Sequence, residues 1–328
     1  MREMTDATLK PDLSLIVPFF NEEENIENLI LQLNSYAEKQ SFSIEAILVD
    51  DGSTDSSVEL LRNVEFNAFT LKLIRLSKNF GSHAAIRAGI AQSAGRYTMF
   101  FSADLQEPFE MIGEMYFKAL EGYNVVVARK AETKVSLFEK AFSNAYTGLV
   151  RRFALRDYPK GGANNFLFSE KVRVYINENI ESNSSVHMQI VSMGFSRAIL
   201  DFSLNARSKG TSKWTLSKKV RLFIDSFVAF SFVPIKAIST LGVLLFIVGF
   251  LFALGIIVVK IFNVFEFNAG YPTLISVLLL GFGVTNFSIG IACEYLWRTF
   301  DAARNRPVYI VDTIEMLAAT VRKNRNAE

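Results

Sequence analysis

Acidic and amide side chains follow an uncharged apolar run in the middle of the sequence. The run ends at Phe101, Asp104 follows it, and Gln106 comes two positions later. A buried strand of a parallel sheet typically has such a sequence, so we expect Asp104 just past the carboxyl end of a central strand. A carboxylate and an amide offer the hard oxygen ligands that suit Mg²⁺ or Mn²⁺. The alternative is a solvated turn in which the acid is incidental.

Two further acidic clusters follow predicted strands nearer the N-terminus. Glu22–Glu24 come soon after the strand 13–17, and Asp50 and Asp51 come directly after the strand 44–49. The carboxyl ends of parallel strands lie at one edge of a sheet, where open α/β sheets bind ligands. Adjacent acids repel each other unless a ribose, a base or a cation engages them, and helix capping alone does not explain the pair.

Strands and helices alternate through the first 130 residues. The segment 22–38 has apolar residues at helical spacing, with Asn21 expected as its N-cap. The small-residue segment 83–94 is expected to form a helix that packs closely on the sheet, and Pro108 to open another helix. This alternation predicts a mostly parallel α/β sheet. The predicted strands are 13–17, 44–49, 71–76, 97–101 and 124–128.

The composition limits the classes of partner and compartment. At 328 residues, the chain is long enough for two units of different kind. A formal net charge of +2 gives no large basic face, so nucleic acid is not expected as a partner. The single cysteine, Cys293, excludes an intramolecular disulfide and fits a reducing compartment. The mean hydropathy of +0.23 reflects an apolar excess towards the C-terminus.

Two long uncharged segments predict an integral membrane protein. Each of 237–259 and 271–293 has 23 residues without a charge, which as a helix of about 1.5 Å rise per residue would cross a hydrocarbon core. The segment before them is amphipathic, as expected of a helix in the membrane interface. Basic residues flank the pair, which places the N-terminal domain and the tail in the cytoplasm. The predicted division is 1–213 (catalytic), 214–234 (interfacial), 235–296 (two spans) and 297–328 (tail).

Four motifs in a fixed order resemble glycosyltransferase family two, which has the GT-A fold. They are Val17–Glu23, Asp50–Asp55, Asn79–Gly81 and Ala103–Pro108. The Asp-Leu-Gln form of the last motif, the segment 207–214 and the two spans are similar to polyprenyl-phosphate glycosyltransferases. This group includes dolichyl-phosphate mannose synthase and bacterial undecaprenyl-phosphate glucosyltransferases, so a bacterial inner membrane is the expected location.

The resemblance implies an inverting transferase that moves one sugar from a nucleotide donor to a polyprenyl phosphate, undecaprenyl or dolichyl, at the cytoplasmic face. UDP-glucose is the first expected donor, and GDP-mannose or another nucleotide sugar is the alternative. A polysaccharide synthase is a second interpretation, but the chain has no Gln-x-x-Arg-Trp motif and too few predicted spans. A membrane-anchored scaffold that has lost activity is a third.

The resemblance also assigns roles to individual residues. It implies that Asp104 and Gln106 hold Mg²⁺ or Mn²⁺ at the donor diphosphate, and that no general base is needed. The positions implied at the donor nucleotide are Pro18, Phe20, Glu22, Asp50, Asp51, Ser102 and Ala103. The positions implied at the reacting phosphates, besides Asp104, are Arg129, Arg207 and Lys213. For the last two, a basic loop that meets anionic lipid headgroups is the alternative.

Two positions depart from the family pattern. Ser102 stands where many members have a metal-binding acid, and Asn164 stands where an acceptor-side acid is expected. The lone histidines, His83 and His187, are expected to have packing or surface roles. The tail segment 307–311 has strand character, and its pairing with a neighbouring copy in a homo-oligomer is a further prediction.

Overall fold

The structure is a computed structural model that describes residues 10–130, 162–180, 185–203, 271–304 and 306–318. It also describes 147–159 except 149, 153 and 154, and scattered residues between 238 and 262. Contacts divide the chain into two compact units, one of residues 1–223 with 307–328 and one of residues 224–306. Each unit is described by itself.

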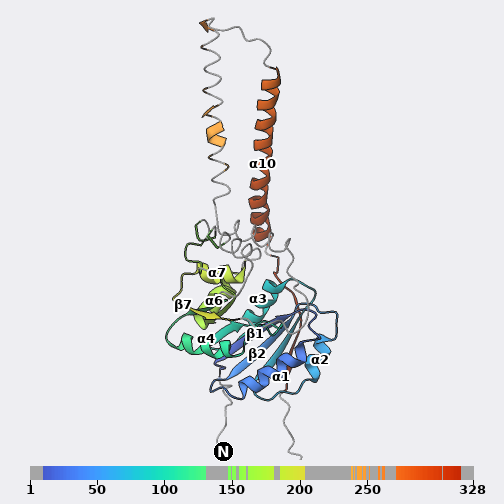
Figure 1. Cartoon of the computed structure of the whole chain (residues 1–328). Helices are drawn as coiled ribbons and strands as arrows, with labels where there is room; N and C mark the ends of the chain where they lie inside the picture. The colour runs from blue at the N-terminus through green and yellow to red at the C-terminus, as the bar shows by residue number, and fades with distance from the viewer. Residues whose placement is uncertain are drawn as a thin grey trace, which may run out of the picture. The chain divides into compact units, whose positions relative to one another are not determined.

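A mixed eight-stranded sheet in the order β7-β5-β6-β4-β1-β2-β3-β8 forms the centre of the first unit (Figure 1). β4, β1, β2 and β3 run parallel to one another, and β5 runs parallel to β7. β6 lies antiparallel between β4 and β5. The α/β sheet expected from the alternating sequence is therefore confirmed. The strands are Leu13–Phe19 (β1), Ile44–Asp50 (β2), Thr70–Leu76 (β3), Tyr97–Phe100 (β4), Val125–Lys130 (β5), Asn165–Ser169 (β6), Arg197–Phe202 (β7) and Val311–Leu317 (β8).

Helices cover both faces of this sheet (Figure 1). α1, α2 and α4 pack on the face to which Leu13, Leu15 and Val17 of β1 point. α3, α6 and α7 cover the opposite face, where a Cβ added at Gly89 of α3 would lie 2.4 Å from Ile16 Cγ2. The expectation that α3 packs closely is thus confirmed. The helices are Ile26–Ala37 (α1), Ser57–Asn63 (α2), Ser82–Gln92 (α3), Glu110–Leu120 (α4), Glu170–Glu178 (α6) and Val186–Ser192 (α7).

The first helix begins four residues later than the sequence pattern predicts. α1 starts at Ile26, and its N-cap residue is Asn25 rather than Asn21. Asn21 instead has a left-handed backbone with φ of 52° and bonds across to the next loop. Glu22 and its neighbours therefore belong to the loop after β1, where backbone N–H groups donate to side chains of the loop after β2 and of the first residue of α2.

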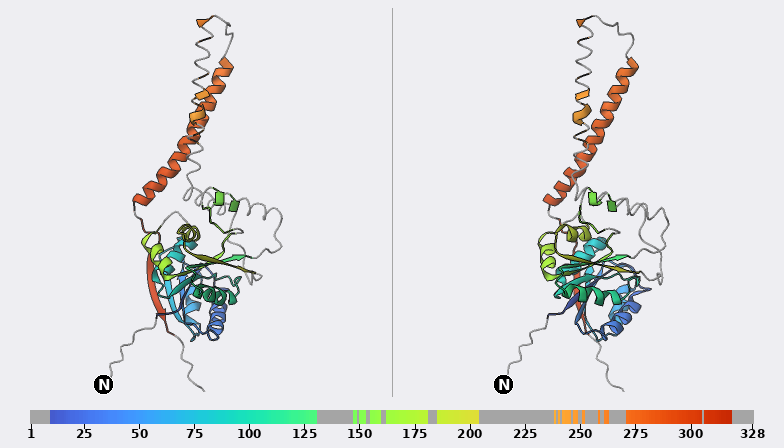
Figure 2. Two further views of the ribbon diagram at one scale, coloured as in Figure 1. Left: turned by 90° about the vertical axis from the view of Figure 1, so that its left-hand side faces the viewer. Right: turned by 60° about the vertical axis from the view of Figure 1, so that its left-hand side comes forward.

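The C-terminal segment returns to the sheet of the first unit, which the sequence did not predict. β8 pairs antiparallel with β3 of its own chain, along the edge visible in Figure 2. Arg62 on α2 makes a two-pronged ion pair with Glu315 on β8, with distances of 3.0 Å from Nε and 2.5 Å from Nη2. The strand character expected near 307–311 thus belongs to Val311–Leu317, and its established partner lies within the chain. Association into a homo-oligomer stays a prediction.

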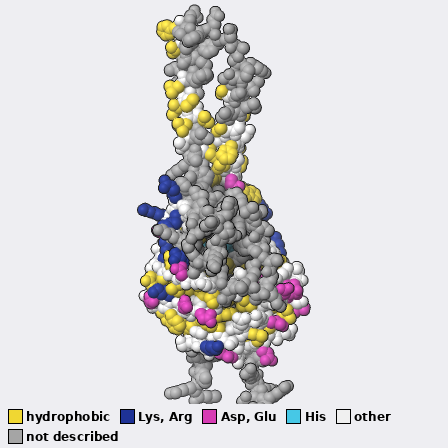
Figure 3. Space-filling view, viewed as in Figure 1, with side chains coloured by type: hydrophobic (Ala, Val, Ile, Leu, Met, Phe, Trp, Pro, Cys, Tyr) yellow, Lys and Arg dark blue, Asp and Glu magenta, His cyan; other side chains and the backbone are white. Residues whose placement is uncertain are grey.

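The second unit contains a long helix with an apolar surface. α10 spans Tyr271–Ala303, 33 residues, so the predicted segment 271–293 is helical. Within the described part of the chain, no helix meets the length and apolarity required to cross a membrane. The segment 237–259 lies largely outside the described residues. Figure 3 shows hydrophobic side chains on the surface of this unit. Those exposed on α10 include Leu274, Val277, Leu278, Phe282, Phe287, Ile289, Leu296, Trp297 and Phe300.

Candidate active site

The predicted acidic clusters lie at the carboxyl edge of three neighbouring strands. β1 lies between β4 and β2 in the sheet, so the loops after these strands are adjacent. The backbone N–H of Asp51 donates to Phe19 O over 2.9 Å, and that of Phe101 donates to Ile16 O over 2.9 Å. Neighbouring strands are about 4.8 Å apart, so one small ligand can contact all three loops. The expectation that these acids converge on one edge is confirmed.

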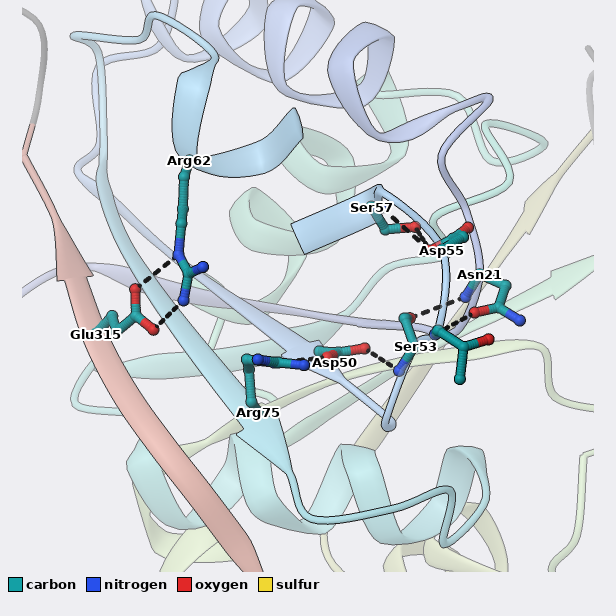
Figure 4. A network of polar contacts seen from close by, with 9 residues as sticks. Asn21, Asp50, Ser53, Asp55, Ser57, Arg62, Arg75 and Glu315 are labelled. Carbon is teal, nitrogen blue, oxygen red and sulfur yellow. Dashed lines mark hydrogen bonds and ion pairs between the residues drawn. The ribbon is translucent and has the colours of Figure 1, made fainter. Parts of the chain in front are cut away.

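The loops after β1 and β2 are joined by reciprocal hydrogen bonds (Figure 4). The Asn21 N–H donates to Ser53 Oγ over 2.9 Å, and the Thr54 N–H donates to Asn21 Oδ1 over 2.9 Å. The Glu22 N–H donates to Ser57 Oγ over 2.9 Å, while the Glu22 carboxylate accepts from Asn25 Nδ2. The predicted donor positions Pro18, Phe20 and Glu22 therefore lie on or beside a loop held in one conformation.

Asp50 stabilises the turn at the end of β2, and its predicted place at the donor nucleotide stays a prediction. Its side chain is fully buried, with Oδ1 accepting from the Ser53 N–H over 2.8 Å and Oδ2 from Arg75 Nε over 3.1 Å. Between them, Gly52 has φ of 74°, and a Cβ there would lie 2.6 Å from the backbone carbon of Lys78. The turn after β2 therefore requires both the glycine and the buried carboxylate.

Asp51 anchors the loop that leads into α3. Its two carboxylate oxygens accept from the N–H groups of Phe80, over 2.7 Å, and Gly81, over 2.9 Å. Burial raises the pKa of Asp51 above its ordinary value, while these two hydrogen bonds oppose the rise. Both adjacent acids thus have partners within the protein, and their proximity does not by itself demand a ligand. The predicted contact of Asp51 with a base or ribose stays a prediction.

Asp104 lies in a tight loop after β4. Its Oδ1 accepts from Ser102 Oγ over 2.8 Å and from the Gln106 N–H over 3.2 Å. Leu105, between them, has φ of 59° and a buried side chain. These hydrogen bonds hold the Asp104 carboxylate against the backbone N–H of Gln106, and the Ser102 hydroxyl donates one of them. Ala103 is buried in the same loop.

The oxygen ligands that this loop offers fit a divalent cation bound to a diphosphate. Among the described residues, no group of three or more His, Cys, Asp or Glu side chains could enclose a metal. Mg²⁺ is often held by one or two carboxylates together with water and substrate phosphates. Asp104 and the Gln106 amide match this sparse arrangement. The Mg²⁺ or Mn²⁺ expected from the sequence would therefore take its remaining ligands from the phosphates of a nucleotide and from water.

The basic positions are only partly within the described residues. Arg129, at the carboxyl end of β5, makes a two-pronged ion pair with Asp201 of β7, over 2.5 and 2.7 Å. Both side chains are partly exposed, at 30% and 51%. Arg207 and Lys213, which were also predicted at the phosphates, lie outside the described residues. Asp201 is a partner that the sequence did not suggest, because the pair forms through the parallel register of β5 and β7.

Comparison with known proteins decides the family. The family model described as Glycosyl transferase family 2 matches residues 14–183. The uncharacterized glycosyltransferase YkcC of Bacillus subtilis (strain 168) is 32% identical over 302 residues, which cover 91% of this chain and 92% of that protein. The chain belongs to glycosyl transferase family 2. It is accordingly a glycosyltransferase, as its motifs predicted.

Further relatives extend the likeness beyond the family domain. The undecaprenyl-phosphate 4-deoxy-4-formamido-L-arabinose transferase of Pectobacterium atrosepticum is 31% identical over 309 residues, covering 92% of each chain. Among solved structures, mannosyl-3-phosphoglycerate synthase from Rubrobacter xylanophilus matches with a TM-score of 0.47 and 15% identity, covering 67% of this chain and 72% of that one.

Glu107 is the site residue that the sequence reasoning missed in this family 2 glycosyltransferase. It is buried, and its carboxylate accepts from the Ser102 N–H over 2.9 Å and from Asn165 Nδ2 over 2.9 and 3.0 Å. Burial raises the pKa of Glu107 to about 7, while the bonds from Ser102 and Asn165 oppose the rise and the nearby Asp104 adds to it. Asn164, where an acid was expected, is exposed, and its N–H bonds Ala128 O.

The two histidines of the glycosyltransferase form a pair rather than lying alone. The rings of His83 and His187 are 5.5 Å apart, and His187 also stacks on Phe166 at 5.1 Å. His83 Nδ1 is buried and has no hydrogen-bond partner within the described residues. Burial lowers the pKa of His83 to about 4 and of His187 to about 3. The positive charge of Arg87 lowers the pKa of His83 further, and a charge on His83 does the same for His187. The expectation of a packing role fits this neutral, aromatic environment.

The depressed histidine pKa values predict acid sensitivity. Because the unfolded chain takes up these protons near pH 6.5 and the folded chain only near pH 3 to 4, their contribution is complete above about pH 6.5 and is lost as the pH falls. His187→Phe keeps the stacking on Phe166 but removes one titrating group. We therefore expect the variant to lose about 1–2 kcal/mol less stability than wild type between pH 7 and pH 5. Denaturant unfolding at both pH values measures this, and equal pH dependence would contradict it.

Proposed function

We propose that this family 2 glycosyltransferase transfers a single sugar from a nucleotide donor to a polyprenyl phosphate, with undecaprenyl phosphate as the first acceptor to test. The observation that carries the proposal is the Asp104–Gln106 loop at the carboxyl edge of the sheet, in a chain whose likeness to an undecaprenyl-phosphate glycosyltransferase covers 92% of its length. That likeness includes the segment after the family domain, which ends at residue 183.

The donor is proposed to lie across the three adjacent loops. Pro18, Phe20 and Glu22 would bound the nucleotide base, on the loop that Ser53 and Ser57 hold in place. Asp51 would contact the base or ribose from the next loop. The Asp104 carboxylate and the Gln106 amide would hold Mg²⁺ or Mn²⁺ against the diphosphate. When bound, the cation would neutralise charge that develops on the leaving nucleoside diphosphate.

The acceptor phosphate can act as nucleophile without a catalytic base. A phosphate monoester has a second pKa of about 6, so it is mostly dianionic at neutral pH. One of its oxygens would attack the anomeric carbon as the bond from that carbon to the diphosphate oxygen breaks. A single displacement of this kind inverts the anomeric centre. Arg129, and Arg207 and Lys213 in the segment that follows β7, would hold the phosphate charge.

Membrane attachment is part of the proposal, because the acceptor is a lipid. Its support is the run of exposed apolar side chains on α10 and the uncharged segment 237–259 of the sequence. A long helix with such a surface gains free energy when the surface leaves water. We propose two spans that hold the catalytic unit at the cytoplasmic face of the membrane. Partition into the membrane fraction, with the N-terminus protected from external protease in intact cells, is the result expected.

A panel of labelled nucleotide sugars tests the proposed reaction. The full chain in detergent would receive undecaprenyl phosphate, Mn²⁺ or Mg²⁺, and one donor at a time. UDP-glucose is the first donor, followed by GDP-mannose and a nucleotide-linked 4-deoxy-4-formamido-L-arabinose, the sugar named in the relative from Pectobacterium atrosepticum. We expect label in the lipid phase with one donor, lost when the metal is chelated. Metal-dependent donor binding without product would reject the lipid acceptor, and the absence of both would favour an inactive scaffold.

A further inference from the structure

A buried side-chain bridge ties the Asp104 loop to an antiparallel strand far along the chain. Glu107 is 8% exposed and Asn165 is 3% exposed. Asn165 Nδ2 donates to both Glu107 oxygens, over 3.0 and 2.9 Å. Asn165 Oδ1 in turn accepts from the Phe166 N–H over 2.7 Å, so the amide orientation is set by the backbone of β6.

The same carboxylate closes the loop that carries Asp104. Glu107 Oε2 accepts from the Ser102 N–H over 2.9 Å, while Ser102 Oγ donates to Asp104 Oδ1 over 2.8 Å. A continuous path of hydrogen bonds therefore runs from β6 through Glu107 and Ser102 to Asp104. Residues that hydrogen-bond to a metal ligand fix its orientation, and their loss commonly weakens metal affinity by about 10–100-fold.

We propose that Glu107, held by Asn165, is a positioning residue that fixes the Ser102–Gln106 loop in the geometry that takes up the divalent cation with the nucleoside diphosphate. The inference rests on the proposed function and extends it to two residues without an assigned role. It predicts that the affinity for the cation requires one carboxylate facing one amide at positions 107 and 165. Which of the two positions carries the carboxylate should matter less.

Exchanging the two side-chain types gives a direct test. Asn165→Asp places a second carboxylate against Glu107, and the repulsion should displace the loop. Combining it with Glu107→Gln restores one amide facing one carboxylate, while the new acid can still accept from the Phe166 N–H. For the full chain in detergent with UDP, and separately with GDP, we expect the Mn²⁺ affinity to fall about tenfold or more in Asn165→Asp. In the double variant it should recover to within about threefold of wild type. Electron paramagnetic resonance of free Mn²⁺ gives these affinities without requiring turnover.

A matched control separates positioning from general stability. Glu45 is also a buried carboxylate, 5% exposed, and it accepts from Ser14 Oγ over 2.6 Å and from the Ala94 N–H over 3.1 Å. It lies near the amino end of β2, at the opposite edge of the sheet. Glu45→Gln should lower the melting temperature but leave the Mn²⁺ affinity within about twofold of wild type.

The outcomes distinguish the inference from the function on which it rests. If wild type binds Mn²⁺ with neither nucleotide, the proposed metal-dependent function fails and the inference falls with it. If wild type binds but Asn165→Asp binds equally well, or if the double variant is no better than the single one, the positioning role alone is overturned. Should Asn165→Asp not fold, Glu107→Gln and Glu107→Ala replace it. The alanine variant must then weaken Mn²⁺ binding at least about fivefold more than the glutamine variant, or the role is rejected.

Discussion

Replacing Asp104 by alanine is expected to reduce sugar transfer by at least about a hundredfold, and to bring it close to background. Asp104 is the acid of the loop after β4 that we propose to hold the cation, since Ser102 occupies the place of a second acid and Glu107 is engaged with Asn165. Initial rates of label transfer to the lipid phase, at saturating donor and several Mn²⁺ concentrations, measure the effect. High Mn²⁺ should not restore the rate, because the ligand itself is gone.

Asp104→Asn is the matched control for this prediction. Its amide oxygen can still accept from Ser102 Oγ and from the Gln106 N–H, so the loop should keep its shape. If the charge is what matters, the asparagine variant should also lose about a hundredfold or more in rate, with an unchanged melting temperature. A variant without this carboxylate that kept a tenth of the wild-type rate would show that Asp104 does not hold the cation.

The parallel half of the fold was predictable because its determinants are local. The buried strands around Ile47 and Met99 are built on the apolar runs 46–49 and 99–101, and the helices between them show helical spacing. The antiparallel pairing was not predictable in the same way. β6 inserts between β4 and β5, and β8 pairs with a strand more than 230 residues earlier in the chain. Such pairing depends on long-range register, which hydrophobic periodicity does not contain.

The position of the site was predictable from the sequence, but which of its acids bond partners within the protein was not. The edge at which Asp104, Asp51 and Glu22 gather follows from strand polarity alone. Asp50 and Asp51 have protein partners, Arg75 and Phe80, that come from the next strand and the loop after it. Two adjacent acids in a sequence suggest a ligand as long as such partners are unknown, and these partners depend on the register of the strands.

The burial of Glu107 was not predictable for a related reason. An acid beside Pro108 is typical of the first turn of a helix, where it would face solvent and favour the helix dipole. Its burial depends on Asn165, 58 residues later, which β6 brings alongside β4. The sequence does carry one indication: two consecutive asparagines directly before an apolar strand, which require hydrogen-bond partners if they are buried.

Replacing Asp50 by alanine is expected to lower the free energy of unfolding by about 3 kcal/mol. The substitution removes a fully buried carboxylate and leaves two donors, the Ser53 N–H and Arg75 Nε, without their acceptor. Arg75 is 33% exposed and can turn to water, which limits the cost to less than that of a fully buried pair. Because the turn after β2 also carries Asp51, we expect the donor KM to rise in the same variant. Denaturant unfolding and donor-dependent rates measure the two effects.

Two further variants separate the causes of this loss. Asp50→Asn keeps an acceptor for the Ser53 N–H but puts an amide NH2 group in place of the oxygen that accepts from Arg75 Nε, so one donor rather than two loses its acceptor and the cost should be about half as large. Glu315→Ala breaks the ion pair with Arg62, in which both partners are partly exposed at 31% and 40%, and should cost less than about 1 kcal/mol. If the loss in Asp50→Ala were no greater than in Glu315→Ala, burial would not be the source of its stabilisation. The turn after β2 would then be held chiefly by Gly52 and by the hydrogen bonds from Asn21 to Ser53 and from Thr54 to Asn21.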